Sequence, residues 1–409
     1  MNRVAQAPRQ NERGFTLAEM MIAITMSTAI IGVAFTTLIV SQKGNQIASQ
    51  VTNAQSTANT GLDMLVADLK LAGFGMDRVN TPIGNCHING VPSVIVPNDN
   101  TPGGPDTGPD SVSLLVPLTN SVAAAGALWQ VNNPGGVPPL FNTIQLPAGV
   151  TTAMIDRGLA LGSIVSLGGA ATGVVNAIGG TSLGFAIPIG QASPFDAQVS
   201  FNQGTLVYLL QCVTYQVIPP PDALGLCGGN APCLVRGLAP LALPGTSPNC
   251  NVAGNACVNV MDGVEDLQLS YACDGCDPRP TSNATAPGIP DGQMDDLDQS
   301  GTFNDPGDFI SQRNWFQTAA PFGNYMTTDK IHLVQVSLVA RQAVSDQGSG
   351  EGNVSAARTA TPLIVGNDHN HANGVFAPGD NATPAQQMAY LQLRRRLVNR
   401  TIELRNQRF

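Results

Sequence analysis

One carboxylate interrupts a long apolar stretch near the start of the chain. Glu19 lies five residues after Gly14, and almost every residue from 15 to 40 is apolar or small. Placing a charged side chain at the centre of a bilayer costs roughly 2.5 to 3.5 kcal/mol on insertion scales. If this stretch enters a membrane, we therefore expect Glu19 to have a positively charged partner.

A second group of residues with oxygen ligands lies between positions 291 and 308. Calcium takes roughly six to eight oxygens, which clustered Asp and Asn side chains and backbone carbonyls can supply. An EF-hand-like loop that begins at Asp296 fits through Thr302 but fails at position 12, which is Gly307, because the carboxylate comes one residue later at Asp308. Bound calcium and a solvated acidic loop are equally weighted alternatives. The candidate ligands are Asp291, Asp295, Asp296, Asp298, Ser300, Thr302, Asn304, Asp305 and Asp308.

Eight cysteines form the third group, and an even number is typical of a disulfide framework outside the cytoplasm. They are Cys86, Cys212, Cys227, Cys233, Cys250, Cys257, Cys273 and Cys276. Eight cysteines allow about a hundred connectivities, so the sequence does not determine the pairing. Short separations favour 227 with 233, 250 with 257 and 273 with 276, which leaves 86 with 212.

The spacing of Cys273 and Cys276 also fits a zinc site or a thioredoxin-like redox pair. No histidine follows at ligand spacing, and no βαβ pattern surrounds the pair. We favour a structural disulfide, with a metal site and a redox pair as the alternatives.

Composition restricts the class of protein. Charged residues make up 11% and aromatic residues 5% of the chain, while 44 Gly and 30 Pro mark many turns, so we expect a loop-rich β domain. The net charge of −9 argues against a nucleic-acid surface, which needs clustered Lys and Arg. His369 and His371 form the one close histidine pair, which we interpret as solvated. The sequence contains no G-x-S-x-G, H-E-x-x-H or Walker motif, so we expect no enzymatic activity.

A long helix must position Glu19. The apolar run is long enough to cross a bilayer core of about 30 Å, and no A-x-A-like cleavage site precedes Ser41. Apolar or small residues then recur every three or four positions, which predicts that the helix continues to about Leu71. Gly73 suits its C-terminus, and interior Gly44 and Gly61 weaken it. The predicted buried face is Ile47, Val51, Ala54, Ala58, Leu62, Leu65, Leu69 and Ala72.

Short β-like runs follow the helix. Residues 76–110 are rich in Pro, Gly, Asn and Asp, which predicts a long exposed loop or embellishment. Period-two or apolar runs predict strands, most of them antiparallel. They occupy residues 112–118, 163–167, 183–189, 206–217, 258–260, 264–271 and 331–341.

The residues around Gly14 resemble a type IV prepilin signal, also called a class III signal. Its features here are a polar leader with Arg3, Arg9 and Arg13, then Gly14, Phe15-Thr16-Leu17, Glu19 and the apolar helix. The resemblance implies that a prepilin peptidase cuts between Gly14 and Phe15 and methylates the new N-terminus. It also implies that Glu19 pairs with the amine of a neighbouring subunit in a filament. The alternative is an ordinary membrane anchor with a chance glutamate.

Four later segments resemble PilW-type minor pilins: residues 62–74, 264–271, 331–341 and the arginine-rich residues 394–406. Six arginines between positions 394 and 408 also fit a nucleic-acid or lipid patch. We favour a charged edge strand, because charge discourages edge-to-edge pairing. Residues 76–260 and 342–390 have no counterpart in this resemblance.

The expected fold is α+β, with a long N-terminal helix packed on an antiparallel β-rich domain with long loops. The first half of the helix is transmembrane and the second half amphipathic. The expected divisions are a leader (1–14), a transmembrane or filament-core helix (15–41), an amphipathic continuation (42–73) and a disulfide-containing β-rich globular domain (74–409).

The resemblance implies a minor pilin that takes part in pilus assembly or priming near the tip. Its partners are other major and minor pilins and prepilin peptidase, and no nucleic acid. It resides in the inner membrane before assembly and in the extracellular pilus afterwards. The alternatives are a calcium-dependent adhesive tip module and a minor pseudopilin of a type II secretion system.

Overall fold

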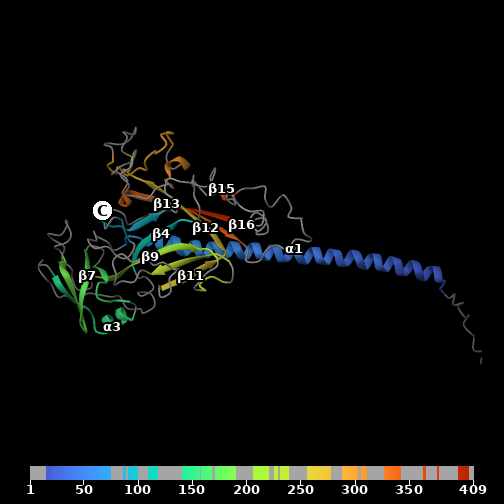
Figure 1. Cartoon of the computed structure of the whole chain (residues 1–409), viewed down its shortest axis with the longest axis horizontal. Coiled ribbons are helices and arrows are strands. Elements are labelled where there is room, and N and C mark those ends of the chain that lie inside the picture. The colour runs from blue at the N-terminus through green and yellow to red at the C-terminus, as the bar shows by residue number, and fades with distance from the viewer. Residues whose placement is uncertain are drawn as a thin grey trace, which may run out of the picture. The chain divides into compact units, whose positions relative to one another are not determined.

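A helix of 55 residues, α1 (Leu17–Leu71), opens the computed structural model (Figure 1). It confirms the predicted helix and its end. The chain divides into two compact units, Met1–Thr52 and Asn53–Phe409, and each is described by itself. The structure describes residues 15–74, 86–88, 91–99, 109–117, 141–156, 158–167, 171–189, 206–220, 225–228, 231–238, 256–277, 288–302, 305–310, 327–341, 363–364, 375–376 and 395–404.

In the first unit, the described part of α1 exposes its apolar side chains. The stretch Leu17–Gln46 has a mean hydropathy of 2.0, and none of its apolar segment is buried. By length and composition it could cross a membrane.

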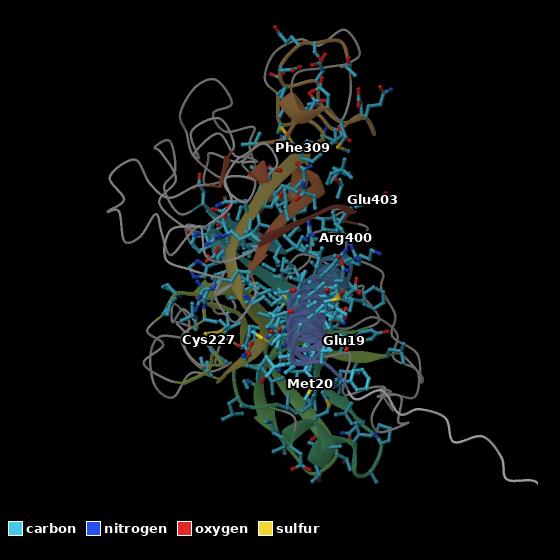
Figure 2. The ribbon with its side chains drawn as sticks, turned by 90° about the vertical axis from the view of Figure 1, so that its right-hand side faces the viewer. Glu19, Met20, Cys227, Phe309, Arg400 and Glu403 are labelled. Carbon is cyan, nitrogen blue, oxygen red and sulfur yellow. A yellow bond between two sulfur atoms is a disulfide. The ribbon has the colours of Figure 1, made fainter. Side chains whose placement is uncertain are left out.

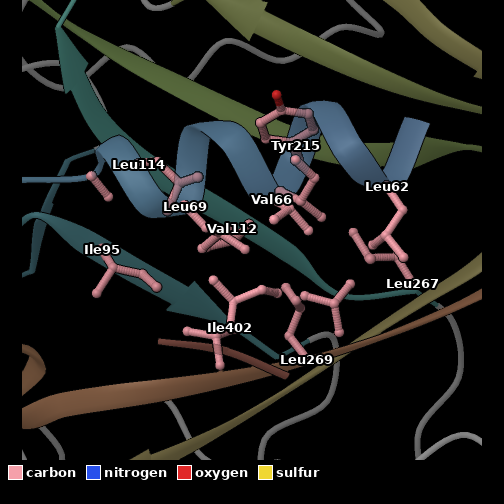
Figure 3. Close-up of a cluster of buried hydrophobic side chains, with 14 of the residues drawn as sticks. Leu62, Val66, Leu69, Ile95, Val112, Leu114, Tyr215, Leu267, Leu269 and Ile402 are labelled. Atoms are coloured by element: carbon pink, nitrogen blue, oxygen red, sulfur yellow. The ribbon is translucent and has the colours of Figure 1, made fainter. Parts of the chain in front are cut away.

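In the second unit, α1 buries the predicted face. Ala58, Leu62, Leu65, Leu69 and Ala72 are at most 1% exposed. The side chains of three other members of that face, at positions 47, 51 and 54, lie outside the described residues. Figure 3 shows the helix against strands from both larger sheets. The period of three or four residues therefore predicted the packing face correctly.

Two glycines fit α1 to its surroundings. Gly73 has a φ of +75°, the left-handed conformation expected at a helix C-terminus, and its N–H donates to the Leu115 carbonyl at 3.0 Å. A Cβ at Gly61 would lie 3.0 Å from the Met261 sulfur. The glycine predicted as a weak point thus lets the helix approach Met261 closely.

The larger sheet has nine strands and is entirely antiparallel. Seven of them follow the order β11-β10-β9-β6-β7-β8-β5, while β4 pairs with β9 and β3 pairs with β4. The strands are β3 (Ile95–Asn98), β4 (Ser111–Pro117), β5 (Phe141–Gln145), β6 (Ile164–Leu167), β7 (Ala171–Ile178), β8 (Ser182–Ile189), β9 (Val207–Ile218), β10 (Cys233–Leu238) and β11 (Ala256–Asp262).

A second antiparallel sheet has the order β12-β13-β16. In its register, Leu338 of the central strand pairs with Leu267 on one side and Val398 on the other. Its strands are β12 (Val264–Cys273), β13 (Ile331–Arg341) and β16 (Arg395–Glu403). Two-residue strands form two small ladders, β1 (His87–Ile88) with β2 (Val91–Pro92) and β14 (Leu363–Ile364) with β15 (Val375–Phe376).

The structure corrects the prediction of one long exposed loop over residues 76–110. The described part contains β1, β2 and β3, and Ile95 is completely buried in the main core. The strands were not predicted because turn-forming residues dominate this segment and each strand contains only a few apolar residues. β5, β7 and β10 were not predicted either.

The described residues of the second unit form four hydrophobic clusters, and the two largest are separate cores. The larger one joins α1 to the three-stranded sheet and to strands β3, β4 and β9–β11. The smaller one lies among β5–β8, the start of β9 and the short helix α3 (Val150–Ile155). We call β5–β8 together with α3 the β5–β8 lobe (Figure 1). Its centre includes Met154 and Leu183, both completely buried.

Candidate processing and assembly site

The N-terminus of α1 is closed by a reciprocal pair of side chains. The Thr16 N–H and hydroxyl each donate to the Glu19 carboxylate at 3.0 Å, and the Glu19 N–H donates to the Thr16 hydroxyl oxygen at 3.3 Å. This is a capping box, which satisfies backbone donors that have no partner within the helix. Glu19 therefore has an intramolecular hydrogen-bond partner, and among the residues that the structure describes no positively charged group pairs with it. The Thr-x-x-Glu spacing of Thr16 and Glu19 is the local signal for this cap.

The predicted scissile bond lies beside this cap. Phe15 is 87% exposed, and Gly14 lies outside the described residues. Glu19 lies near the exposed end of the helix (Figure 2). A free amine created at Phe15 would stand one residue before the N-cap.

The predicted calcium ligands do not all converge. Carboxylate oxygens of Asp296, Asp298 and Asp308 lie within 4.8 Å of one another. The 3₁₀ helix η1 (Pro306–Asp308) brings Asp308 back to this group, although it falls one residue late for the EF-hand pattern. The carboxylates of Asp291 and Asp305 do not belong to this group, whereas the Ser300 N–H donates to Asp296 and Asp298 at 3.0 and 2.9 Å. Thr302 is described in the same loop, and Asn304 lies outside the described residues.

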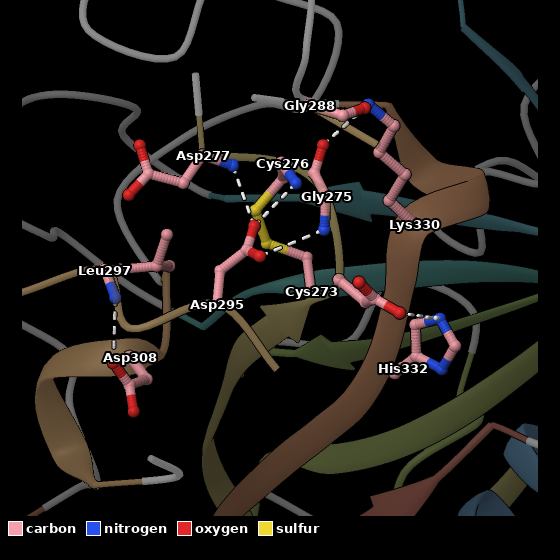
Figure 4. Close-up of a disulfide and its surroundings, with 11 residues drawn as sticks. Cys273, Gly275, Cys276, Asp277, Gly288, Asp295, Leu297, Asp308, Lys330 and His332 are labelled. Atoms are coloured by element: carbon pink, nitrogen blue, oxygen red, sulfur yellow. Dashed lines mark hydrogen bonds and ion pairs between the residues drawn. A yellow bond between two sulfur atoms is a disulfide. The ribbon is translucent and has the colours of Figure 1, made fainter. Parts of the chain in front are cut away.

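Asp295 supports a different structure. Its carboxylate accepts the N–H groups of Gly275, Cys276 and Asp277 at 3.1, 2.7 and 2.7 Å (Figure 4). The Lys330 ammonium donates to the carbonyls of Gly275 and Gly288 at 2.7 and 2.9 Å. Asp295 and Lys330 thus fix the Cys273–Cys276 turn to the segment that follows it.

We call the described residues 288–302 and 305–310 the acidic lobe. Its return to the sheet is fixed by paired backbone bonds between Ile310 and Tyr271 at 2.9 and 3.0 Å. The adjoining Phe309 is 8% exposed (Figure 2). Backbone N–H groups that donate to carboxylates stabilise much of the rest of the acidic lobe. The Leu297 and Asp305 N–H groups, for example, donate to the carboxylate of the completely buried Asp308.

Burial and backbone donors shift the ionisation of these groups. Burial raises the pKa of Asp295 and of Asp308 and lowers the pKa of Lys330. The Ser300 N–H lowers the pKa of Asp298 by binding its charged form.

The structure contains the disulfides Cys86–Cys212, Cys227–Cys233 and Cys273–Cys276. Cys257 is also disulfide-bonded, and its expected partner Cys250 lies outside the described residues. Short separations favoured Cys227–Cys233 and Cys273–Cys276, and Cys86–Cys212 is the pair that those assignments left over. Cys273 and Cys276 are at most 1% exposed, which argues against thiol–disulfide exchange because that reaction needs an accessible sulfur.

Arginines of β13 and β16 bind carboxylates. Arg395 and Arg341 both bind the Glu265 carboxylate, each with a guanidinium nitrogen at 3.0 Å. Arg400 pairs with Asp63 of α1. β16 lies at the edge of its sheet, as expected for a charged edge strand.

A network between α1 and the nine-stranded sheet was not predicted. The Asp68 carboxylate accepts the Tyr215 hydroxyl at 2.6 Å and the Arg236 Nε–H at 2.8 Å. Its partners lie 147 and 168 residues away in sequence.

Residues 9–35 match the family model of the prokaryotic N-terminal methylation motif. Neither the curated proteins nor the solved structures compared with this chain gave a match. The family match supports a class III, prepilin-like signal peptide. It covers only the N-terminal segment and does not distinguish the PilW type.

Proposed function

We propose that the chain is a PilW-like minor pilin, made as an inner-membrane precursor and assembled near the tip of a type IV pilus. The observation that carries the proposal is the methylation motif on an exposed apolar helix that begins with Glu19 in its first turn. Prepilin peptidase removes the leader after Gly14. The Phe15 amine of one subunit then supplies a positive partner for Glu19 of a neighbouring subunit.

A low-dielectric environment makes this pairing selective. An unpaired carboxylate surrounded by apolar helices costs free energy. The register that places Glu19 beside an amine is therefore favoured over other registers of the incoming subunit. The exposed apolar side chains of α1 leave the bilayer and pack against other pilin helices. The β-rich second unit, by this proposal, projects from the filament.

Mass spectrometry of sheared filaments tests the processing step. We expect a peptide that begins with N-methyl-Phe15 and no peptide from residues 1–14. Gly14→Val should leave the leader attached and remove the methylated peptide. A full-length N-terminus in sheared filaments would contradict the proposal.

A type II secretion pseudopilin has the same signal, so a genetic comparison must separate the two systems. Deleting the gene should reduce surface pili and leave exoprotein release unchanged. Loss of exoprotein release with normal pili would favour the pseudopilin.

Calcium binding in the acidic lobe is a second candidate function. The observation that favours it is the convergence of Asp296, Asp298 and Asp308, with Asp308 completely buried. Within the part of the chain that the structure describes, none of these carboxylates has an ion pair, and a divalent cation would offset their repulsion. An all-oxygen donor set fits calcium better than zinc.

Calcium at about 100 times its Kd should raise the free energy of unfolding by about 2.7 kcal/mol. The double variant Asp296→Asn, Asp298→Asn should lose this stabilisation, measured by denaturant titration with and without calcium. Asp291→Asn is the matched control, since Asp291 lies outside the convergent group. Equal stability of the unsubstituted protein with calcium and with chelator would exclude the site.

An adhesive role for the acidic lobe would follow only from a separate result. Asp296→Ala with Asp298→Ala should then abolish surface binding while pilus number stays unchanged. Normal surface binding by this variant would leave the lobe without an adhesive function.

A further inference from the structure

Three side chains that can ligate a metal meet at the Cys273–Cys276 turn. The two sulfurs and one oxygen of the Asp295 carboxylate all lie within 4.8 Å of one another. Figure 4 shows the Asp295 carboxylate beside the two sulfurs. In the disulfide, each sulfur is bonded to the other. A metal can therefore bind this group only while both cysteines are thiols, before the disulfide closes.

Contacts that do not involve the sulfurs shape the turn. Gly275 has a φ of +81°, and a Cβ at this position would lie 2.6 Å from the Pro290 nitrogen. Three backbone N–H groups at the turn donate to the Asp295 carboxylate, and the Lys330 ammonium donates to the Gly275 carbonyl at 2.7 Å. None of these contacts uses a cysteine sulfur. We therefore expect them to hold Asp295 against the turn in the thiol form as well.

The turn lies in negatively charged surroundings. Asp274 and Asp277 are 2% and 3% exposed. Burial, and to a smaller extent the Asp274 charge, raise the pKa of Asp295. Lys330 opposes this negative charge, and so does His332 when it is protonated, since its ring nitrogen lies 4.0 Å from the Asp274 carboxylate. Two thiolates would add two further negative charges, which a divalent cation at the sulfurs offsets.

The donor atoms favour zinc over the other common divalent ions. Zinc binds cysteine sulfur and aspartate oxygen, whereas calcium and magnesium bind oxygen ligands. Three protein ligands leave the fourth position of a tetrahedral zinc site to water. Among the residues that the structure describes, the Cys227–Cys233 pair belongs to no such group of three ligands. A short separation between two cysteines is therefore not enough, and Asp295 distinguishes the Cys273–Cys276 pair.

We propose that Cys273, Cys276 and Asp295 bind one zinc ion while the cysteines are thiols. Each thiol loses its proton and its sulfur becomes a zinc-bound thiolate, so the metal is neither oxidised nor reduced. Zinc must leave when a thiol oxidant closes the disulfide, because the two sulfurs then give two electrons to the oxidant and bond to each other. Bound zinc thus delays this closure while other cysteine pairs form. The site depends neither on filament entry nor on calcium binding at Asp296.

Alkylation of the individual cysteines tests the site in the full chain. The protein is unfolded and reduced, refolded in nonionic detergent with a phosphine reductant, with or without zinc, and pulsed with iodoacetamide. Mass spectrometry of the peptides reports each cysteine separately. With zinc at about 100 times its Kd, about 1% of the sites are free, so alkylation of Cys273 and Cys276 should slow at least about tenfold. Alkylation of Cys227 and Cys233 should not change. Equal alkylation with and without zinc, or equal protection of Cys227 and Cys233, would overturn the proposal.

Two carboxylate variants make the result specific. Asp295→Asn removes the charge of one ligand and should lose most of the protection. Asp291→Asn should retain it, because Asp291 lies in the same segment but outside the group of three ligands. Full protection in Asp295→Asn would contradict the assignment of this ligand.

A cysteine variant separates the loss of a ligand from the loss of the turn. Oxidised without zinc, Asp295→Asn should still form the Cys273–Cys276 disulfide, which shows that the turn is intact. If it does not, Cys273→Ser decides, since it removes one ligand and leaves the Asp295 contacts in place. Zinc should then leave Cys276 unprotected, and continued protection of Cys276 in Cys273→Ser would overturn the proposal.

Discussion

Replacing Asp68 with alanine is expected to lower the free energy of unfolding by about 3 to 5 kcal/mol, the usual effect of removing one partner of a buried ion pair. The Asp68 and Arg236 side chains are 13% and 18% exposed. Without the carboxylate, the Arg236 guanidinium and the Tyr215 hydroxyl lose the acceptor that joins α1 to the nine-stranded sheet. The second unit should therefore lose the polar contact that fixes α1 against this sheet.

The ionisation of this network supports the size of the effect. Burial, and then the neighbouring Asp68 carboxylate, raise the pKa of Tyr215 far above its usual range. The phenol therefore stays protonated and donates at any physiological pH. Burial opposes the charge on Arg236, but Asp68 and Tyr215 outweigh it and raise the pKa of Arg236. Asp68→Ala leaves that charge half-buried without its counterion.

An exposed ion pair on the same helix provides the control. Asp63 pairs with Arg400, and their side chains are 61% and 38% exposed. Asp63→Ala should therefore change stability by only about 0 to 1 kcal/mol. Guanidinium titration of the full chain in nonionic detergent, followed by near-UV circular dichroism, measures both variants. If Asp68→Ala costs no more than Asp63→Ala, the buried network does not anchor the helix.

A compensated variant separates the loss of the pair from the loss of packing. Asp68→Ala combined with Arg236→Met removes both charges, and the longer apolar side chain keeps much of the volume. This double variant should recover most of the stability. No recovery would mean that the charges themselves are not the cause.

The contrast between α1 and its partners shows what the sequence could predict. The helix face from Ala58 to Ala72 was predictable because a period of three or four residues is a local pattern. The Gly73 conformation was predictable for the same reason. Asp68 lies off the predicted apolar face, and its partners Tyr215 and Arg236 come from strands far along the chain. Such a contact is fixed by the fold and leaves no local signal.

The acidic lobe shows the same limit within a single loop. Counting positions from Asp296 rejected the EF-hand because Asp308 falls one residue late. The 3₁₀ turn at Pro306–Asp308 shortens the path and returns Asp308 to the group. Counting also placed Asp295 with the calcium ligands, whereas three N–H groups near Cys276 bind its carboxylate instead. Sequence spacing could not show which way a side chain in an irregular loop turns.

β5 and β7 of the β5–β8 lobe were missed for a different reason, whereas β6 and β8 were predicted. β7, for example, contains Ala171, Gly173 and Ala177, and these residue types have low β propensity. Pairing with β6 and β8 makes it a strand. Tertiary pairing overrides weak local preference here, so β7 becomes visible only in the structure.

Glu19→Ala is expected to be cleaved normally after Gly14 but to be almost absent from filaments. Its side chain makes two separable contributions. The capping box with Thr16 stabilises the first turn of α1, typically by about 1 kcal/mol. The negative charge, by our proposal, pairs with the Phe15 amine of a neighbouring subunit. Alanine removes both, so this variant alone cannot say which contribution assembly requires.

Glu19→Gln and Thr16→Val separate the two contributions. Glutamine can still complete a capping box but carries no charge, whereas Thr16→Val removes the hydroxyl and keeps the Glu19 charge. If charge pairing drives assembly, immunoblots of sheared pili should show Glu19→Gln as depleted as Glu19→Ala, and Thr16→Val only mildly reduced. Normal incorporation of Glu19→Gln would instead assign the glutamate to helix capping. Membrane levels and leader removal, measured on the same cells, must be equal among the variants. A variant that is cleaved and stable in the membrane but scarce in filaments then lacks only the pairing of the Glu19 charge with the Phe15 amine. By our proposal, this pairing selects the position of the subunit in the filament.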